Sequence, residues 1–353
     1  MKKFLALLLA LIMSLALVAC GGDDTAADTA TDDTATEDTG AESTDSGFEP
    51  QTWKFACSAT ETSTWVQAAK KFGELVSEAT GGAITVEYYP ADQLTAGNQT
   101  DGIQALMDGT TQLSMHSNLI YSSFDQRFNV VSLPFLFDSV EEADEKLDGE
   151  GGDALKAILE EYNLHCMGIG ENGFRHITNS KHTVASLADM KGLKMRVAGS
   201  QLLNRAYELW GADYTNANWS EVFTALQTGT YDGQENPLPT ADAASIQEVQ
   251  KYLTYWTGSY DCLFFCMNKE LYDSLSPELQ AIVDEAGQEA VEYQREINRG
   301  EDEAIMDKWA EAGVEVTVLS EEAAAEFKAA SDPCYEEFAD ELTPELIAAF
   351  TGE

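Results

Sequence analysis

Arginine is scarce in this 353-residue sequence, which has 62 Asp and Glu residues against 20 Lys and Arg and a formal charge of −42. A small anionic ligand would therefore need a local group of positive side chains. The planar guanidinium suits a carboxylate better than an ammonium group does. Arg196 follows a Lys-Gly turn in a short apolar stretch, so it can project from the carboxyl end of a strand. The six arginines to consider are Arg127, Arg175, Arg196, Arg205, Arg295 and Arg299.

Other chemical motifs are weak. Gly168, Gly170 and Gly173 have the spacing of a dinucleotide-binding loop, but the residues that follow them are extended and turn-like rather than helical. We interpret these glycines as points of backbone freedom where the chain crosses between domains. The sequence has no Gly-x-Ser-x-Gly motif, and its four His residues lack zinc-ligand spacing. We therefore expect no enzyme activity, no metal and no cofactor, and the acidic surface disfavours nucleic acid.

The N-terminus predicts export and lipidation. An apolar run, Phe4–Val18, follows a basic start and is too short to span a bilayer. It ends at Leu17-Val18-Ala19-Cys20, which matches a bacterial lipobox. We expect residues 1–19 to be a signal peptide and Cys20 to carry the lipid that anchors the chain to the bacterial cell membrane, on its extracytoplasmic side. An ordinary export signal with an incidental cysteine is the alternative.

A disordered tether is predicted next, over residues 20–47. Residues 21–47 contain nine acidic residues and seven Thr but no Lys, Arg or aromatic residue, so they cannot bury enough apolar surface to fold. The folded part then starts near Phe48. From there on the chain has 53 acidic and 18 basic residues, a formal charge of −35.

The cysteines of the folded part do not form a disulfide framework, because their number is odd and their spacing irregular. Cys262 and Cys266 would lie roughly 13 Å apart on one strand, too far to bridge. Buried thiols are expected, and one long-range disulfide remains open. The five residues concerned are Cys57, Cys166, Cys262, Cys266 and Cys334.

Alternating strand and helix patterns indicate an α/β fold. The first alternation predicts strands at 51–58, 83–89 and 112–117 and helices at 64–80 and 97–108. The second predicts a strand at 194–197, helices at 200–210 and 220–228, and a strand end at 231–237. Strands in series at 252–258 and 263–268 suit crossings between two lobes. A helical pattern from Pro277 to Gly313, with kinks near Gly287 and Gly300, would span roughly 54 Å. We expect lobe I at 48–173 and 262–301, and lobe II at 174–261 and 302–353.

A long signature lies in the second alternation. It begins with Phe174-Arg175-x-x-Thr178-Asn179 and ends with the run Ala225–Pro237, Ala-Leu-Gln-Thr-Gly-x-x-Asp-Gly-Gln-Glu-Asn-Pro. With these residues the sequence resembles the DctP-type solute-binding proteins of tripartite ATP-independent periplasmic (TRAP) transporters, over about residues 50–350. The resemblance implies a two-lobed fold like periplasmic binding proteins of type II, with hinge strands and a long helix spanning both lobes. It also implies a receptor for a small organic acid that works with an ion-gradient-driven membrane permease.

The resemblance also implies roles for particular residues. The arginine matching Arg196 forms a two-pronged salt bridge with a ligand carboxylate, and the one matching Arg175 contacts the ligand or positions the first. The residue matching Asn236 orients Arg196 and hydrogen-bonds the ligand. For all three, purely structural roles are the alternative. Weaker candidates in the first lobe, at strand ends or loop starts, are Thr60, Gln93, Asn98 and Asn118.

One stretch departs from the family pattern. The family usually has Gly-Ala-x-Pro-x-Pro before the signature helix, whereas residues 211–219 lack both prolines. Trp219 stands where an aromatic pocket residue often lies, although a role in the core is equally open. Together with Trp219, an amphipathic pocket wall could be formed by Tyr214, Asn216 and Asn218. Such a wall puts a simple aliphatic dicarboxylate in doubt. Two rival functions stay open: a receptor for an ATP-driven importer, and a surface-anchored hydrolase.

Overall fold

The computed structural model describes residues 47–352, which belong to one compact unit. The expected signal peptide (1–19), the expected lipid-bearing Cys20 and all but the last residue of the expected tether lie outside these residues. Within the described range, no helix combines the length and apolar character that crossing a membrane would need.

The first sheet forms the core of one lobe. Its strand order is β2-β1-β3-β10-β4, with β1 parallel to β2 and β3, and β10 antiparallel to β3 and β4. The strands are β1 (Gln51–Cys57), β2 (Ile84–Tyr89), β3 (Leu113–Ser117), β4 (Leu164–Phe174) and β10 (Tyr260–Asn268). Helix α1 (Thr64–Ala79) begins where Ser63 accepts a hydrogen bond from the Val66 amide, and it buries one apolar face. It packs against β2 and against helix α10.

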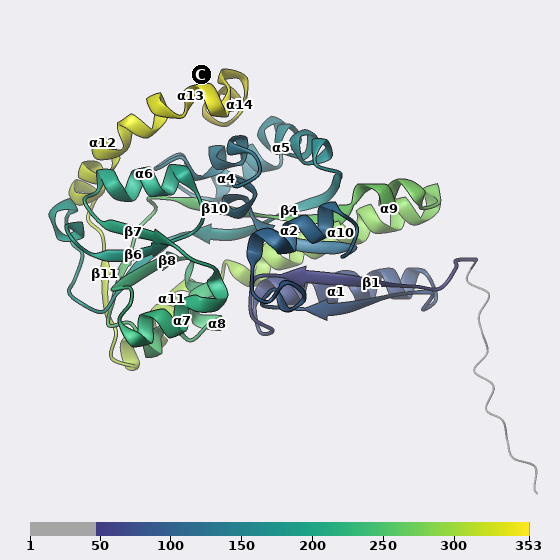
Figure 1. Ribbon diagram of the computed structural model, residues 1–353, viewed down its shortest axis with the longest axis horizontal. Helices are drawn as coiled ribbons and strands as arrows, with labels where there is room; N and C mark the ends of the chain where they lie inside the picture. The colour runs from purple at the N-terminus through teal and green to yellow at the C-terminus, as the bar shows by residue number, and fades with distance from the viewer. Residues whose placement is uncertain (1–46, 353) are drawn as a thin grey trace, which may run out of the picture. The chain divides into compact units, whose positions relative to one another are not determined.

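The remaining elements of the first lobe surround this sheet (Figure 1). Asn98 caps helix α2 by accepting from two backbone amides of its first turn. The helices are α2 (Gln99–Met107), α3 (Asn118–Tyr121), α4 (Val140–Leu147), α5 (Glu150–Glu161) and α9 (Lys269–Ser274), with two 3₁₀ helices, η1 (Gln93–Thr95) and η2 (Gln126–Ser132).

The second sheet forms the core of the other lobe. Its order is β11-β9-β5-β8-β6-β7, and β6 is parallel to both of its neighbours. The strands are β5 (His176–Asn179), β6 (Lys194–Val197), β7 (Asp213–Asn216), β8 (Gly233–Asn236), β9 (Tyr252–Tyr255) and β11 (Glu315–Val318). The helices are α6 (Gln201–Leu209), α7 (Trp219–Thr228), α8 (Leu238–Ala243) and α11 (Asp302–Glu311), with η3 (Leu187–Met190) and η4 (Ile246–Glu248).

The chain crosses between the sheets from β4 to β5 and from β9 to β10. Strand β4 continues through all three glycines of the Gly-rich stretch, so Gly168 and Gly170 lie within the strand and not at the expected crossing between domains. A Cβ on Gly168 would lie 2.6 Å from Cγ2 of Val291, and one on Gly170 would lie 2.9 Å from Oε1 of Gln294. These two glycines therefore allow close packing of a helix on the strand. Gly173, with a φ of +112°, has the left-handed backbone that glycine permits.

The predicted long helical pattern is carried by two helices. Helix α10 (Pro277–Asn298) packs against α1 and β4, and α11 packs against α8 and β11. Arg299 ends the first helix beside Gly300, close to the second expected kink. The helical run thus passes from one lobe to the other with a break at the crossing.

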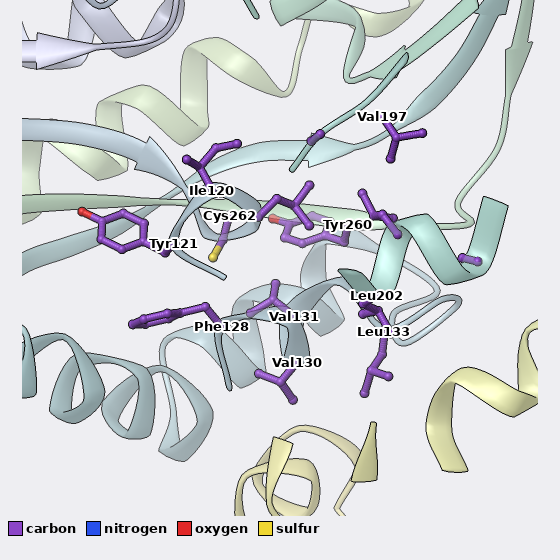
Figure 2. Packing of buried hydrophobic residues seen from close by; sticks show 14 of the residues in the cluster. Ile120, Tyr121, Phe128, Val130, Val131, Leu133, Val197, Leu202, Tyr260 and Cys262 are labelled. Carbon is purple, nitrogen blue, oxygen red and sulfur yellow. The ribbon is translucent and has the colours of Figure 1, made fainter. Parts of the chain in front are cut away.

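A hydrophobic cluster joins elements of both lobes. Figure 2 shows Tyr121 and Phe128 of the first lobe in the same cluster as Val197 and Leu202 of the second. The C-terminal helices are α12 (Glu321–Glu337), α13 (Ala339–Leu342) and α14 (Pro344–Thr351). Helix α12 contacts α6, whereas α13 contacts η2 and α14 contacts α5, so the chain end lies against both lobes (Figure 1). All five cysteines of the described residues are free and buried.

Candidate functional site

A cavity lies between the two lobes. The empty space between its walls, including its mouth, is about 350 Å³. That space is at the lower end of the range typical of small-molecule sites. The first lobe contributes Ser58, Ala59, Trp65, Gln99, Ser117 and Ile120, and the second contributes Arg196, Ala198 and Trp219. The chain near the crossings contributes Asn172, Arg175, Asn236, Thr240 and Asp261.

Arg196 is a buried cation without a carboxylate partner among the described residues. It lies on β6, and its Nε and Nη2 donate to the carbonyl oxygen of Ala217 at 3.0 and 2.7 Å. The ring of Trp219 lies 5.6 Å from its Cζ, a cation–π distance. Burial lowers the pKa of Arg196 to about 10, against the opposing charge of Glu235. The side chain therefore stays charged at neutral pH and lacks the counter-ion that a buried charge requires.

Arg175 has the opposite surroundings. It follows β4, is buried, and forms ion pairs with Glu235 and Asp261. Its Nη2 also donates to the backbone oxygen of Glu235 at 2.9 Å and to Oδ1 of Asn236 at 3.0 Å. Burial disfavours its charge, but the two carboxylates raise the pKa of Arg175 above its ordinary value. Arg175 lines the cavity with its charge already balanced.

Asn236 lies at the end of β8, next to the arginine strand β6. Its Oδ1 accepts from Arg175, and its Nδ2 donates to Oε1 of Gln234 at 2.8 Å. Gln234 in turn donates to Oγ1 of Thr178 on the neighbouring strand β5 at 2.9 Å. Within the described part of the chain, the side-chain hydrogen bonds of Asn236 thus run to Arg175 and Gln234, and not to Arg196.

Trp219 and Asn218 begin helix α7 at the lobe boundary. The backbone amide of Trp219 donates to Oε1 of Gln99 at 3.0 Å, and its ring lines the cavity. Asn218 accepts from the Gln99 amide at 3.4 Å but does not line the cavity. Next to it, Ser220 donates to the carbonyl oxygen of Gly97 at 3.0 Å. The start of α7 and the start of α2 are therefore bound to each other across the lobes.

The structure places the remaining sequence candidates away from the cavity lining. Thr60 donates to the carbonyl oxygen of Ala243 at 3.2 Å, and Gln93 is exposed. Asn118 is buried, donates to Phe128 and Ser132, and accepts from Cys262. Of three further candidates, Asn98 caps α2 and Tyr214 lies exposed on β7. The third, Asn216, donates to the backbone oxygens of Val197, the last residue of β6, and Ala198. Thus Arg196, Arg175, Asn236 and Trp219 meet at the cavity.

Several lining residues escaped the sequence analysis. Ser58 and Ser117 lie at strand ends, two positions from the candidate Thr60 and one from the candidate Asn118. A polar residue at a strand end thus pointed to the right segment but not to the right side chain. Asp261 has no local signal because it is one of 62 acidic residues. It accepts from Ser117 at 2.7 Å and from Asn172 at 2.8 Å, and burial raises its pKa against the effect of Arg175. Among the described residues, no group of His, Cys, Asp and Glu is placed to hold a metal ion.

Comparison with known sequences finds relatives among bacterial binding proteins. The pattern of DctP, the bacterial extracellular solute-binding protein family 7, matches residues 55–342. The 2,3-diketo-L-gulonate-binding periplasmic protein YiaO of Escherichia coli (strain K12) is 36% identical over 271 residues, which cover 77% of this chain and 82% of that protein. The C4-dicarboxylate-binding periplasmic protein DctP of Rhodobacter capsulatus is 30% identical, with 85% and 90% covered.

Solved structures share the arrangement of the chain. The sugar acid binding protein DctPAm from Advenella mimigardefordensis strain DPN7T, in complex with galactonate, superposes with a TM-score of 0.83 at 30% identity, covering 86% of this chain and 97% of that one. A TRAP periplasmic solute binding protein from Sulfurospirillum deleyianum with bound succinate gives a TM-score of 0.80 at 27% identity, covering 86% and 99%.

Proposed function

Because the chain belongs to the DctP family of TRAP periplasmic solute-binding proteins, we propose that it captures a small organic acid in its interlobe cavity and delivers it to a TRAP permease. The predicted α/β fold of type II binding proteins is confirmed by the solved relatives. The family comprises extracytoplasmic solute-binding proteins and not enzymes, which favours this function over a hydrolase. The solved relatives include TRAP binding proteins, which favours it over a receptor of an ATP-driven importer.

The buried, unpaired charge of Arg196 carries this proposal. The carbonyl oxygen of Ala217 takes the edge of the guanidinium formed by Nε and Nη2. The edge formed by Nη1 and Nη2 is then left for the two oxygens of a ligand carboxylate, which would accept two parallel N–H bonds. The ligand supplies the counter-charge that Arg196 lacks, whereas Arg175 holds Asn236 and the acidic residues behind it in place.

Ligand binding is coupled to closure of the lobes. Arg196 and Trp219 belong to one lobe and Ser58, Trp65 and Ser117 to the other, so a ligand touching both sets binds the closed form best. It shifts the open–closed equilibrium by that difference in affinity. The closed receptor then engages the permease, where an ion gradient drives transport as in the family. The lipid on Cys20 would hold the receptor at the membrane.

A thermal-shift screen tests the function. The panel contains monocarboxylates, dicarboxylates, keto acids, sugar acids and aromatic acids. An acid at 100 times its Kd stabilises the folded state by about 2.7 kcal/mol, and the neutral amide of the same acid does not. If no acid in the panel raises the melting temperature, the proposed function is wrong.

A further inference from the structure

Two buried polar atoms at the cavity have no hydrogen-bond partner among the described residues: Oγ of Ser58 and Nε1 of Trp65. Each side chain is 4% exposed, and both residues line the cavity. Their neighbours there are satisfied, since Ser117 donates to Asp261 and Thr240 donates to Asn172. A buried donor without an acceptor is costly. Because both residues line the cavity, a molecule that enters it can supply the missing hydrogen-bond partners.

Packing alone does not require these polar atoms. Trp65 is the second residue of α1 and belongs to the apolar cluster between α1 and the first sheet. A phenylalanine would fill much of that space without an N–H group. Ser58 directly follows β1, where an alanine would fit the same backbone. The fold therefore does not need these two polar atoms, which lie on the lobe opposite Arg196.

The charges around the cavity favour a ligand with one negative charge over a ligand with two. The two carboxylates Glu235 and Asp261 match the two arginines in number, but both of them pair with Arg175, so Arg196 is left without a partner. Asp261 itself lines the cavity and is buried. A second ligand carboxylate would meet Asp261 without a cation of its own, because the other lining groups from the first lobe are uncharged. Neighbouring carboxylates in a buried site repel each other.

We propose that the ligand is a monocarboxylate that carries hydroxyl or oxo groups, and that dicarboxylates bind more weakly. Its carboxylate pairs with Arg196, and an oxygen at its other end accepts from Nε1 of Trp65 and exchanges a hydrogen bond with Oγ of Ser58. This inference rests on the proposed function and adds the residues that distinguish between classes of acid.

Calorimetric titrations of three classes of probe test the inference. The probes are hydroxylated monocarboxylates (gluconate, galactonate, glucuronate and galacturonate), hexanoate as an acid without hydroxyl groups, and the dicarboxylates succinate and glutarate. We expect the best hydroxylated acid to bind at least about tenfold more tightly than hexanoate and the dicarboxylates. Trp65→Phe and Ser58→Ala should each reduce that preference over hexanoate by about three- to tenfold, the effect of one hydrogen bond.

The preference is a ratio measured on one protein sample, so partial unfolding of a variant cancels. Trp53→Phe is the matched control, because Trp53 is equally buried but donates to Gln51 at 3.0 Å, away from the cavity. Tighter binding of a dicarboxylate, or an unchanged preference in both variants, would overturn the inference while leaving the proposed function intact. If no acid binds, the proposed function itself fails. If acids bind but Arg196→Met leaves all acid binding unchanged, the pairing of Arg196 with the ligand carboxylate is wrong, and the inference falls with it.

Discussion

At the scale of single residues, two arginines with similar burial have opposite surroundings. Arg175 is surrounded by Glu235, Asp261 and Asn236, and its hydrogen bonds connect the crossing strand to β8. Arg196 is held by one backbone oxygen and one aromatic ring and has no counter-ion among the described residues. Burial of an ion costs several kcal/mol unless a partner compensates for it. We therefore expect the first arginine to stabilise the protein and the second to be available to a ligand.

This contrast predicts opposite effects on the stability of the ligand-free protein. Arg175→Met leaves Glu235 and Asp261 buried without their cation and should lower the free energy of unfolding by about 3–5 kcal/mol. Arg196→Met removes an uncompensated charge and should leave that free energy unchanged or raise it. Urea unfolding of both variants without ligand measures the difference. Equal losses of stability would contradict the assignment of roles.

At the scale of elements, the starts of helices α2 and α7 hold the lobes together at the cavity. Gln99 and Gly97 on one side bind Trp219, Asn218 and Ser220 on the other. Gly97 has a φ of +84°, and a Cβ there would lie 2.5 Å from Oγ of Ser220. The contact between residues 97 and 220 thus requires glycine at position 97. We expect this contact to exist only when the lobes are closed.

Gly97→Ala should therefore weaken ligand binding by roughly tenfold without touching the ligand, because it penalises the closed form. Gly82→Ala is the matched control, since Gly82 has a φ of +86° but nothing within 4 Å of a Cβ. Both variants share the backbone strain, and only the first obstructs closure. Calorimetry gives the affinities, and small-angle scattering with ligand gives the radius of gyration. Equal affinities in the two variants would exclude this role of the contact.

Local patterns predicted the elements well, and contacts between distant segments explain the rest. The bounds of helix α1 and strand β6 were predicted to within about one residue, because the cap of the helix and the apolar spacing of both elements depend only on residues close together in the sequence. The course of β4 through its glycines was missed, because it depends on Val291 and Gln294 of a distant helix. At the site, Arg196 stood out by its rarity, whereas Asp261 and Trp65 reach the cavity only through the fold.

At the scale of the whole molecule, the charge of the chain opposes its ligand. The folded part carries a formal charge of −35 from residue 48 on, so an approaching acid is repelled until it enters the cavity. Arg196 acts only at short range because it is buried. Salt screens the long-range repulsion between exposed charges far more than a contact inside the cavity.

The association rate of an acid ligand should consequently rise with ionic strength, and the dissociation rate should change little. Stopped-flow tryptophan fluorescence can follow both rates, because Trp65 and Trp219 line the cavity. The salt series is best run with chloride salts, with a neutral sugar at matched osmolarity as the control. An association rate that falls as salt is added would show that attraction, and not repulsion, governs the approach.

The affinity of Arg196→Met for the best acid of the thermal-shift panel tests the central claim most directly. Arg205→Met serves as the control, since Arg205 is paired with Glu208 and Glu337 away from the cavity. If the ligand carboxylate pairs with Arg196, the first variant loses about 2–5 kcal/mol of binding free energy, at least roughly thirtyfold in Kd, and the control binds as the unmodified protein does. An Arg196→Met protein that is folded and binds the acid with unchanged affinity would contradict the account.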